Sequence, residues 1–169
     1  PAIVIKGRVT DAADGHGLVN VPIQTTYDYV PSAITADDGE YLFYKNDRGL
    51  PFNIFTRGAQ PRIDQVYPGI PCIYYQCIRT GQTFSPARGS VVEHIDFALQ
   101  AGSAISGTIY DATTGLPIAG VIDIYDQDFS VVWSGEANAS GAYASGAWHP
   151  GTYYVKAGGY MGAVFGCAF

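Results

Sequence analysis

A short stretch near the start of the chain occurs again one hundred residues later, and this internal repeat limits the fold more than any other feature. Residues 7–18 read GRVTDAADGHGL, and residues 107–118 read GTIYDATTGLPI. A glycine, a β-branched residue, Asp-Ala and a second glycine keep their spacing in both copies. Repeated segments of this kind mark repeated structural units. The sequence therefore predicts two related units in series.

Alternating apolar and polar residues predict strands in the first copy. Ile3, Ile5 and Val9 share one side of a pattern with a period of two, as in a half-buried strand. Regular alternation returns at residues 95–99, Ile-Asp-Phe-Ala-Leu, which we expect to form the strand that closes the first domain. No pattern indicates a helix of three turns. Short strands separated by turn residues are typical of an all-β sandwich.

The second copy is shorter than the first and contains no counterpart of the predicted closing strand. We expect an all-β fold of two tandem Ig-like or prealbumin-like sandwiches, residues 1–100 with a cysteine-bracketed loop insertion and residues 101–169. A sandwich without its last strand has an unpaired edge. Two explanations stay open: the natural chain continues past residue 169, or another chain supplies the strand by β-augmentation and forms a polymer.

The first residues of the chain are the predicted strand donor for such a polymer. Ala2, Ile3, Val4 and Ile5 are more apolar than residues 102–105, Gly-Ser-Ala-Ile, their counterparts in the second copy. We therefore expect these four residues to complete the second sandwich of another copy, head to tail.

The three cysteines predict one disulfide. Cys72 and Cys77 bracket a loop of four residues, a spacing that allows a disulfide if the Cα atoms come within reach. Two buried thiols are the alternative interpretation. Cys167 is the odd cysteine, either free or paired outside this sequence. A zinc site is not indicated, because no second pair of Cys or His residues lies at the spacing of zinc ligands.

Composition argues against several classes of partner. Nine Lys and Arg against 15 Asp and Glu give a formal net charge of −6, which does not suit nucleic acid. No apolar run approaches the ~18 residues of a membrane span, so we expect no membrane insertion. Thirteen Tyr and 21 Gly accompany a charged fraction of 14%, as in many β-rich proteins outside the cell. We expect a secreted or cell-surface location.

No residue pattern indicates catalysis. Nucleophile-elbow, zinc-protease and P-loop motifs are absent from the sequence, and the three histidines share no motif. Asp123, Asp126 and Asp128 lack the glycine and distal glutamate of a calcium loop. We therefore predict no catalytic residues, no cofactor, no metal and no enzymatic activity.

Aromatic side chains indicate one alternative, carbohydrate binding. Tyr74 and Tyr75 at the tip of the cysteine loop, with Trp148 and Tyr154, would provide flat rings on which sugars stack. Tyrosine and tryptophan are also favoured within sheets, so packing between strands is the competing interpretation.

Both copies resemble the carboxypeptidase regulatory-like domains, a group of prealbumin-like sandwiches. The resemblance is carried by residues 107–112, 115–121, 140–143 and 151–155 of the second copy. Residues 67–72, YPGIPC, and residues 95–99, IDFAL, are similar to tandem repeats of secreted bacterial proteins. The resemblance implies the sandwich fold and roles as spacers, accessory domains or adhesin stalks, and it implies no peptidase site.

Together these observations predict a non-enzymatic extracellular structural protein, a stalk or a pilus-like filament subunit that assembles by strand complementation. Its partners would be copies of itself or neighbouring domains of a longer chain. The alternative is an accessory carbohydrate-binding or spacer module of a larger secreted enzyme or adhesin.

Overall fold

The computed structural model describes residues 2–46, 49–72 and 78–158. Regular structure in these residues is β, apart from the single 3-10 turn η1 (Ile78–Thr80). The predicted all-β fold class is confirmed. The chain divides into two compact units, Pro1–Gly102 and Ser103–Phe169, called unit 1 and unit 2 below. No helix in the described ranges is long and apolar enough to cross a membrane.

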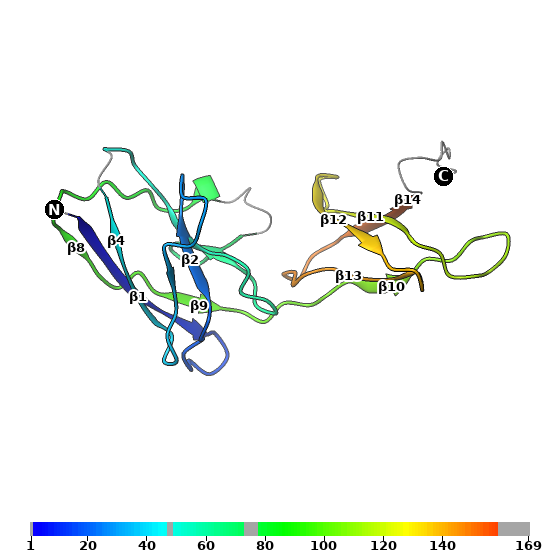
Figure 1. Cartoon of the computed structure of the whole chain (residues 1–169), viewed down its shortest axis with the longest axis horizontal. Coiled ribbons are helices and arrows are strands. Elements are labelled where there is room, and N and C mark those ends of the chain that lie inside the picture. Colours follow the sequence, from blue (N-terminus) through cyan, green and yellow to red (C-terminus); the bar gives the residue numbers. More distant parts are fainter. Residues whose placement is uncertain (1, 47–48, 73–77, 159–169) are drawn as a thin grey trace. The chain divides into compact units, whose positions relative to one another are not determined.

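Unit 1 contains two sheets (Figure 1). One has the order β4 (Glu40–Lys45), β1 (Ile3–Asp11), β8 (Val91–Val92), and β9 (Phe97–Leu99) also pairs with β1. The other has the order β3 (Ala33–Ile34), β2 (Pro22–Thr25), β5 (Ile54–Thr56), β6 (Gln65–Val66), β7 (Ile70–Pro71).

Strand β1 has neighbours on both sides. On one side β4 runs antiparallel to it, and on the other side β8 and β9 run parallel to it. Val9 is opposite Phe97 in the parallel pair. Beyond the regular ladder, the Ala12 amide donates to the Leu99 carbonyl at 2.9 Å and the Ile95 amide donates to the Lys6 carbonyl at 3.2 Å. The segment around β9 therefore closes the sheet along the whole second half of β1.

The core of unit 1 lies between the two sheets and is built from the alternating apolar positions. Each Val, Ile, Leu or Phe that is fully buried stabilises the fold by about 1.5–3 kcal/mol. Both sheets contribute to this cluster, which includes Ile3, Ile5, Val9, Ile23, Tyr41, Phe43, Ile54, Ile95, Phe97 and Leu99. On β4 the intervening residues, Leu42 and Tyr44, are exposed, as a period of two requires.

Unit 2 repeats part of this arrangement. β10 (Ser106–Thr108) pairs with β13 (Ala142–Ala144), and a second sheet has the order β12 (Val131–Ala137), β11 (Gly120–Tyr125), β14 (Tyr154–Gly158). All of these pairs are antiparallel. The buried apolar side chains among its described residues are Ile122, Ile124, Val132, Ala137 and Trp148.

The repeated turn after the first strand has the same hydrogen bonds in both units. In unit 1 the Asp11 amide donates to the His16 carbonyl at 2.9 Å, and in unit 2 the Asp111 amide donates to the Leu116 carbonyl at 2.9 Å. Gly15 and Gly115 both have a positive φ, 77° and 69°, which glycine adopts without strain. The sequence repeat thus encodes the same backbone path, and β1 and β10 are equivalent strands.

Candidate functional site

The clearest difference between the two units is the edge of β10. Its counterpart β1 has strands on both sides, whereas β10 pairs only with β13 among the described residues (Figure 1). The backbone groups of Ile105 and Ile109 are used on the β13 side, through the carbonyl of Ile105 and the amide of Ile109. Groups alternate along a strand, so those of Ser106 and Thr108 point to the other edge. That edge is where β9 lies in unit 1, and we call it the open edge.

In unit 1, the segment of residues 95–99 completes the sheet beside β1, and we call it the closing segment. A glycine and a tyrosine allow and stabilise its close approach to β1. A Cβ added to Gly7 would lie 2.0 Å from the Ile95 carbonyl oxygen, so only glycine allows this approach. The Tyr41 hydroxyl donates a hydrogen bond to the same oxygen at 2.6 Å. Tyr41 is buried, and burial raises the pKa of its hydroxyl, which therefore stays protonated as a donor.

Unit 2 retains both residues, and among its described residues no segment takes the place of the one that they contact in unit 1. Gly107 is paired with Tyr143, as Gly7 is paired with Tyr41. The three atoms nearest to a Cβ added to Gly107 all belong to the Tyr143 side chain, the closest being its hydroxyl oxygen at 2.7 Å. The place that Ile95 has in unit 1 is thus not taken by the backbone of any described residue of unit 2.

Removing the hydroxyl of Tyr41 is expected to destabilise unit 1. Tyr41→Phe would leave the Ile95 carbonyl without this donor, at a cost of about 1–2 kcal/mol in the free energy of unfolding. Chemical denaturation of the full chain measures the loss. The matched control is Tyr44→Phe, because Tyr44 is 71% exposed on the same strand and should change stability by less than about 0.5 kcal/mol. Equal effects of the two substitutions would contradict the role of Tyr41.

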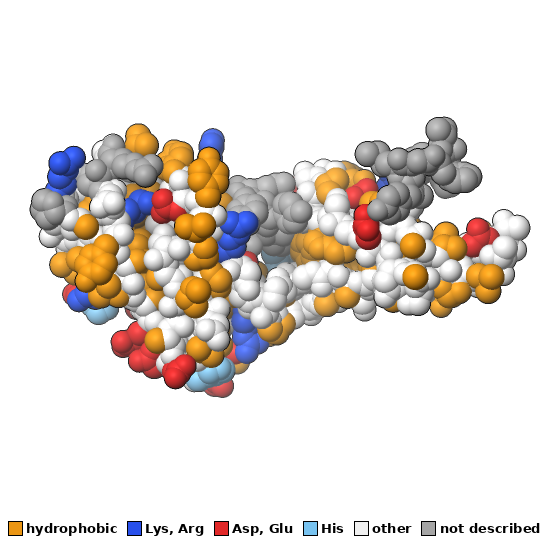
Figure 2. Space-filling model, in the orientation of Figure 1, with side chains coloured by type: hydrophobic (Ala, Val, Ile, Leu, Met, Phe, Trp, Pro, Cys, Tyr) orange, Lys and Arg blue, Asp and Glu red, His pale blue; other side chains and the backbone are white. Residues whose placement is uncertain are grey.

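Apolar residues near the open edge are less buried than their counterparts. Ile3, Ile5 and Val9 are at most 2% exposed in unit 1. In unit 2, Ile105 and Ile109 are only half-buried. Leu116, in the adjoining turn, is 64% exposed. Charged side chains are sparse on the face of unit 2 drawn in Figure 2. Among the described residues, the open edge thus combines backbone groups that no strand pairs with incompletely covered apolar side chains. This combination favours the addition of another strand.

The predicted strand donor is wrong for the folded chain. Ile3, Val4 and Ile5 lie in β1, where Val4 is opposite Tyr44 on one side and Val91 on the other. Ile3 and Ile5 are core residues, 2% and 0% exposed, and Ala2 directly precedes them. Donating this segment to another copy would remove a central strand from unit 1.

The predicted sugar-binding aromatics do not form one exposed surface. Trp148 is 4% exposed, so its ring is a core element and cannot stack on a sugar. Tyr154 is 46% exposed, and its ring stacks on Phe129 with centroids 4.9 Å apart. Tyr74 and Tyr75 lie outside the described residues.

The predicted disulfide is not decided by the described residues. Cys72 is buried next to β7, and its amide donates to the Asp64 carbonyl at 2.6 Å. Cys77 and Cys167 lie outside the described residues. The disulfide between Cys72 and Cys77 therefore stays a prediction.

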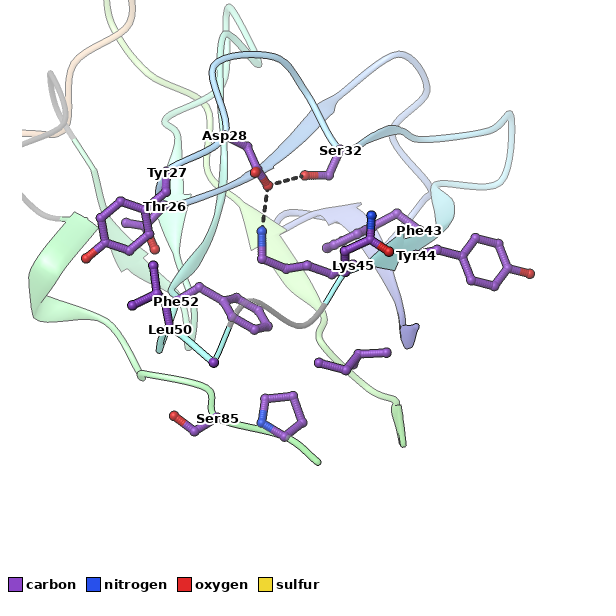
Figure 3. Close-up of a pocket in the computed structure, with 14 residues that line it drawn as sticks. Thr26, Tyr27, Asp28, Ser32, Phe43, Tyr44, Lys45, Leu50, Phe52 and Ser85 are labelled. Carbon is purple, nitrogen blue, oxygen red and sulfur yellow. Dashed lines mark hydrogen bonds and ion pairs between the residues drawn. The ribbon is translucent and has the colours of Figure 1, made fainter. Parts of the chain in front are cut away.

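A depression of about 430 Å³ in unit 1 was not predicted from the sequence (Figure 3). Lys45 points from the end of β4 toward Asp28, and the two groups form an ion pair of 2.7 Å. The Lys45 ammonium also donates to Thr25 Oγ1 at 2.6 Å and lies 5.1 Å from the centre of the Phe52 ring. The two charged residues that line the depression in the described part of the chain thus neutralise each other.

Tyr27 at the rim of the depression has an unusual backbone conformation. Its φ is 72°, in the left-handed region that bulky residues rarely adopt, and its side chain is 70% exposed. The adjacent Asp28 accepts hydrogen bonds from Lys45, Thr25 and Ser32. These bonds fix the turn from which Tyr27 projects.

The Asp28 carboxylate is expected to make stability depend on acid pH. Its burial raises the pKa, but hydrogen bonds from Lys45 and Thr25 outweigh that effect, and the pKa lies below the usual 3.8. The contribution to stability is therefore complete above about pH 3.8 and is lost as pH falls through the lower folded-state pKa. Asp28→Asn should lower the free energy of unfolding by about 1 kcal/mol at pH 7, because a partly exposed ion pair contributes little more than that. Near pH 2 the loss should be clearly smaller. A loss measured by chemical denaturation that is the same at both pH values would contradict this expectation.

One group of described side chains has ligand atoms close enough for a metal ion. One ligand atom each from Asp11, Asp14 and His16 lies within 4.8 Å of the others. The Asp11 carboxylate is already paired with the Arg62 guanidinium, and it also accepts the Ala13 amide at 2.8 Å. The arginine charge disfavours a cation at this turn, so we assign no metal site to it.

Comparisons with known proteins give distant similarities only. No protein-family model matches the chain, and no curated protein matches it significantly. Among solved structures, the Bacillus anthracis TIE protein has a TM-score of 0.41 at 10% identity over 94% of this chain and 26% of its own. A Streptococcal ancillary pilin has a TM-score of 0.40 at 11% identity over 92% of this chain and 53% of its own. A DUF3823 family protein from Parabacteroides merdae has a TM-score of 0.34 at 15% identity over 93% of this chain and 81% of its own.

Proposed function

We propose that this chain is a non-enzymatic extracellular structural protein, a stalk or filament subunit in which unit 2 accepts a β-strand from another chain. The observation that carries the proposal is the open edge: β1 has two neighbours, and the equivalent β10 has one among the described residues. An added strand would satisfy the outward backbone groups of Ser106 and Thr108. It would also cover Ile105 and Ile109.

The extracellular, non-enzymatic part of the proposal has separate support. Charged residues make up 14% of the chain, while Gly and Tyr are abundant, as in many β-rich secreted proteins. Among the described residues, the charged groups that line the depression in unit 1 are Lys45 and Asp28, and they are paired with each other. Neither charge is left to act on a substrate.

The assembly state of the purified full chain tests the proposal. We expect light scattering after size-exclusion chromatography to detect species larger than a monomer as concentration rises, and electron microscopy to detect fibres. Thr108→Pro should abolish this assembly, because proline removes an amide that points to the open edge. Thr108→Val is the matched control, since it keeps the amide and should assemble normally.

A monomer at every concentration, with no fibres, would contradict assembly between chains. It would favour the alternative of a spacer module within a longer secreted protein. Equal assembly of the proline and valine variants would show that contacts elsewhere on the surface hold the chains together, and would also contradict the proposal.

A further inference from the structure

We infer that the strand accepted by unit 2 belongs to a partner chain, runs parallel to β10 and has the side-chain pattern Ile-x-Phe-x-Leu. This inference rests on the proposed function, because it takes another chain as the source of the strand. It deepens that function by specifying the direction, the register and the residue types of the partner segment.

The direction follows from the equivalent strand in unit 1. β9 runs parallel to β1, with Val9 opposite Phe97 and Asp11 opposite Leu99. The Ala12 amide at the start of the turn then donates to the Leu99 carbonyl at 2.9 Å. Ala112 starts the equivalent turn of unit 2, and the shared hydrogen bonds of the two turns place its amide to donate to the equivalent carbonyl of the added strand.

Gly107 and Tyr143 fix the register. In unit 1 the carbonyl oxygen of Ile95 is the atom that approaches Gly7 and accepts the Tyr41 hydroxyl bond. The first apolar residue of the incoming strand therefore belongs opposite Gly107, with its carbonyl oxygen at the Tyr143 hydroxyl. A register shifted by one residue would turn every apolar side chain away from the core.

The side chains of the closing segment in unit 1 specify what an added strand should supply to the described part of unit 2. Ile95, Phe97 and Leu99 are 3%, 2% and 0% exposed, so they fill the core of unit 1. Between them, Asp96 accepts the Arg8 amide at 2.8 Å, and a polar residue at this position would accept the equivalent Thr108 amide. The partner segment thus alternates large apolar residues with at least one short polar acceptor.

A synthetic peptide with the sequence of residues 91–100, VVEHIDFALQ, tests the inference on the full chain. The matched control peptide, VVEHDIAFQL, has the same composition but exchanges neighbours so that the apolar residues face the other side. We expect the first peptide to bind at least about tenfold more tightly, since large apolar side chains contribute about 1.5–3 kcal/mol each when buried. Hydrogen exchange should slow at the outward-facing amide of Thr108.

Two variants examine the proposed contacts. Gly107→Val should abolish peptide binding, because its side chain would occupy the path of the incoming backbone. Tyr143→Phe, which leaves the strand geometry intact, should weaken binding about five- to tenfold through loss of one hydrogen bond. Circular dichroism of both variants checks that each remains folded.

Equal affinity of the two peptides, or protection confined to unit 1, would overturn the inference. Chains could then still assemble through β10 with a different strand, so the proposed function would stand. Conversely, specific peptide binding by a chain that stays monomeric would support the inference and contradict assembly between chains.

Discussion

Replacing Phe97 by alanine is expected to lower the free energy of unfolding of unit 1 by about 3–5 kcal/mol, as for other fully buried phenylalanines. Phe97 is 2% exposed at the centre of the closing segment. Its ring meets that of Tyr67 edge-on, with centroids 6.1 Å apart and planes at 81°. Alanine would leave a cavity between the two sheets where β9 meets β1.

Chemical denaturation of the full chain, with hydrogen exchange assigning the transition to unit 1, measures this loss. Leu42→Ala is the control, because Leu42 is 46% exposed on the outer side of β4. The Leu42→Ala substitution should lower the free energy of unfolding by about 1 kcal/mol or less. A Phe97→Ala variant as stable as the Leu42→Ala variant would show that the closing segment contributes little to unit 1.

A methyl group at position 7 is expected to be nearly as damaging. Gly7→Ala should cost about 3 kcal/mol, at the upper end of overpacking effects. The new Cβ would lie 2.0 Å from the Ile95 carbonyl oxygen and 2.6 Å from its carbonyl carbon. These are backbone atoms, and the Ile95 amide is itself bonded to the Lys6 carbonyl of β1, so the closing segment must move away.

The same substitution in unit 2 provides the control and examines the open edge directly. A Cβ at Gly107 would meet only Tyr143 ring and hydroxyl atoms among its three nearest neighbours, and that side chain can shift. Gly107→Ala should therefore cost less than about 1 kcal/mol, measured by the same denaturation experiment. A loss as large as that of Gly7→Ala would mean that a backbone segment already fills the space beside β10.

Much of the fold was predictable because alternation and turn residues are local signals. The pattern of Ile3, Ile5 and Val9 identified β1, and residues 95–99 identified the segment that closes its sheet. The repeat of Gly7 at Gly107 aligned the two units. Among the described residues, β10 pairs only with β13.

The burial of Ile3, Ile5 and Trp148 was not predictable, because it depends on which faces tertiary packing covers. The apolar pattern of residues 2–5 is the same whether the edges of the strand are free or paired with neighbours. Trp148 lies outside the named strands, in an isolated bridge to Ser103, where no period indicates burial. The depression in unit 1 was missed since its ion pair joins Asp28 in a turn to Lys45 at a strand end, 17 positions apart.

The parallel pairing of β1 with β9 has a mechanical consequence. β1 begins at Ile3, and β9 ends at Leu99, so the two ends at which tension along the chain would pull on unit 1 are the start of one strand and the finish of its neighbour. Such tension slides the two strands past each other and loads their hydrogen bonds in shear, all together. Unit 1 should therefore resist stretching far better than an antiparallel hairpin, whose bonds break one after another from the end.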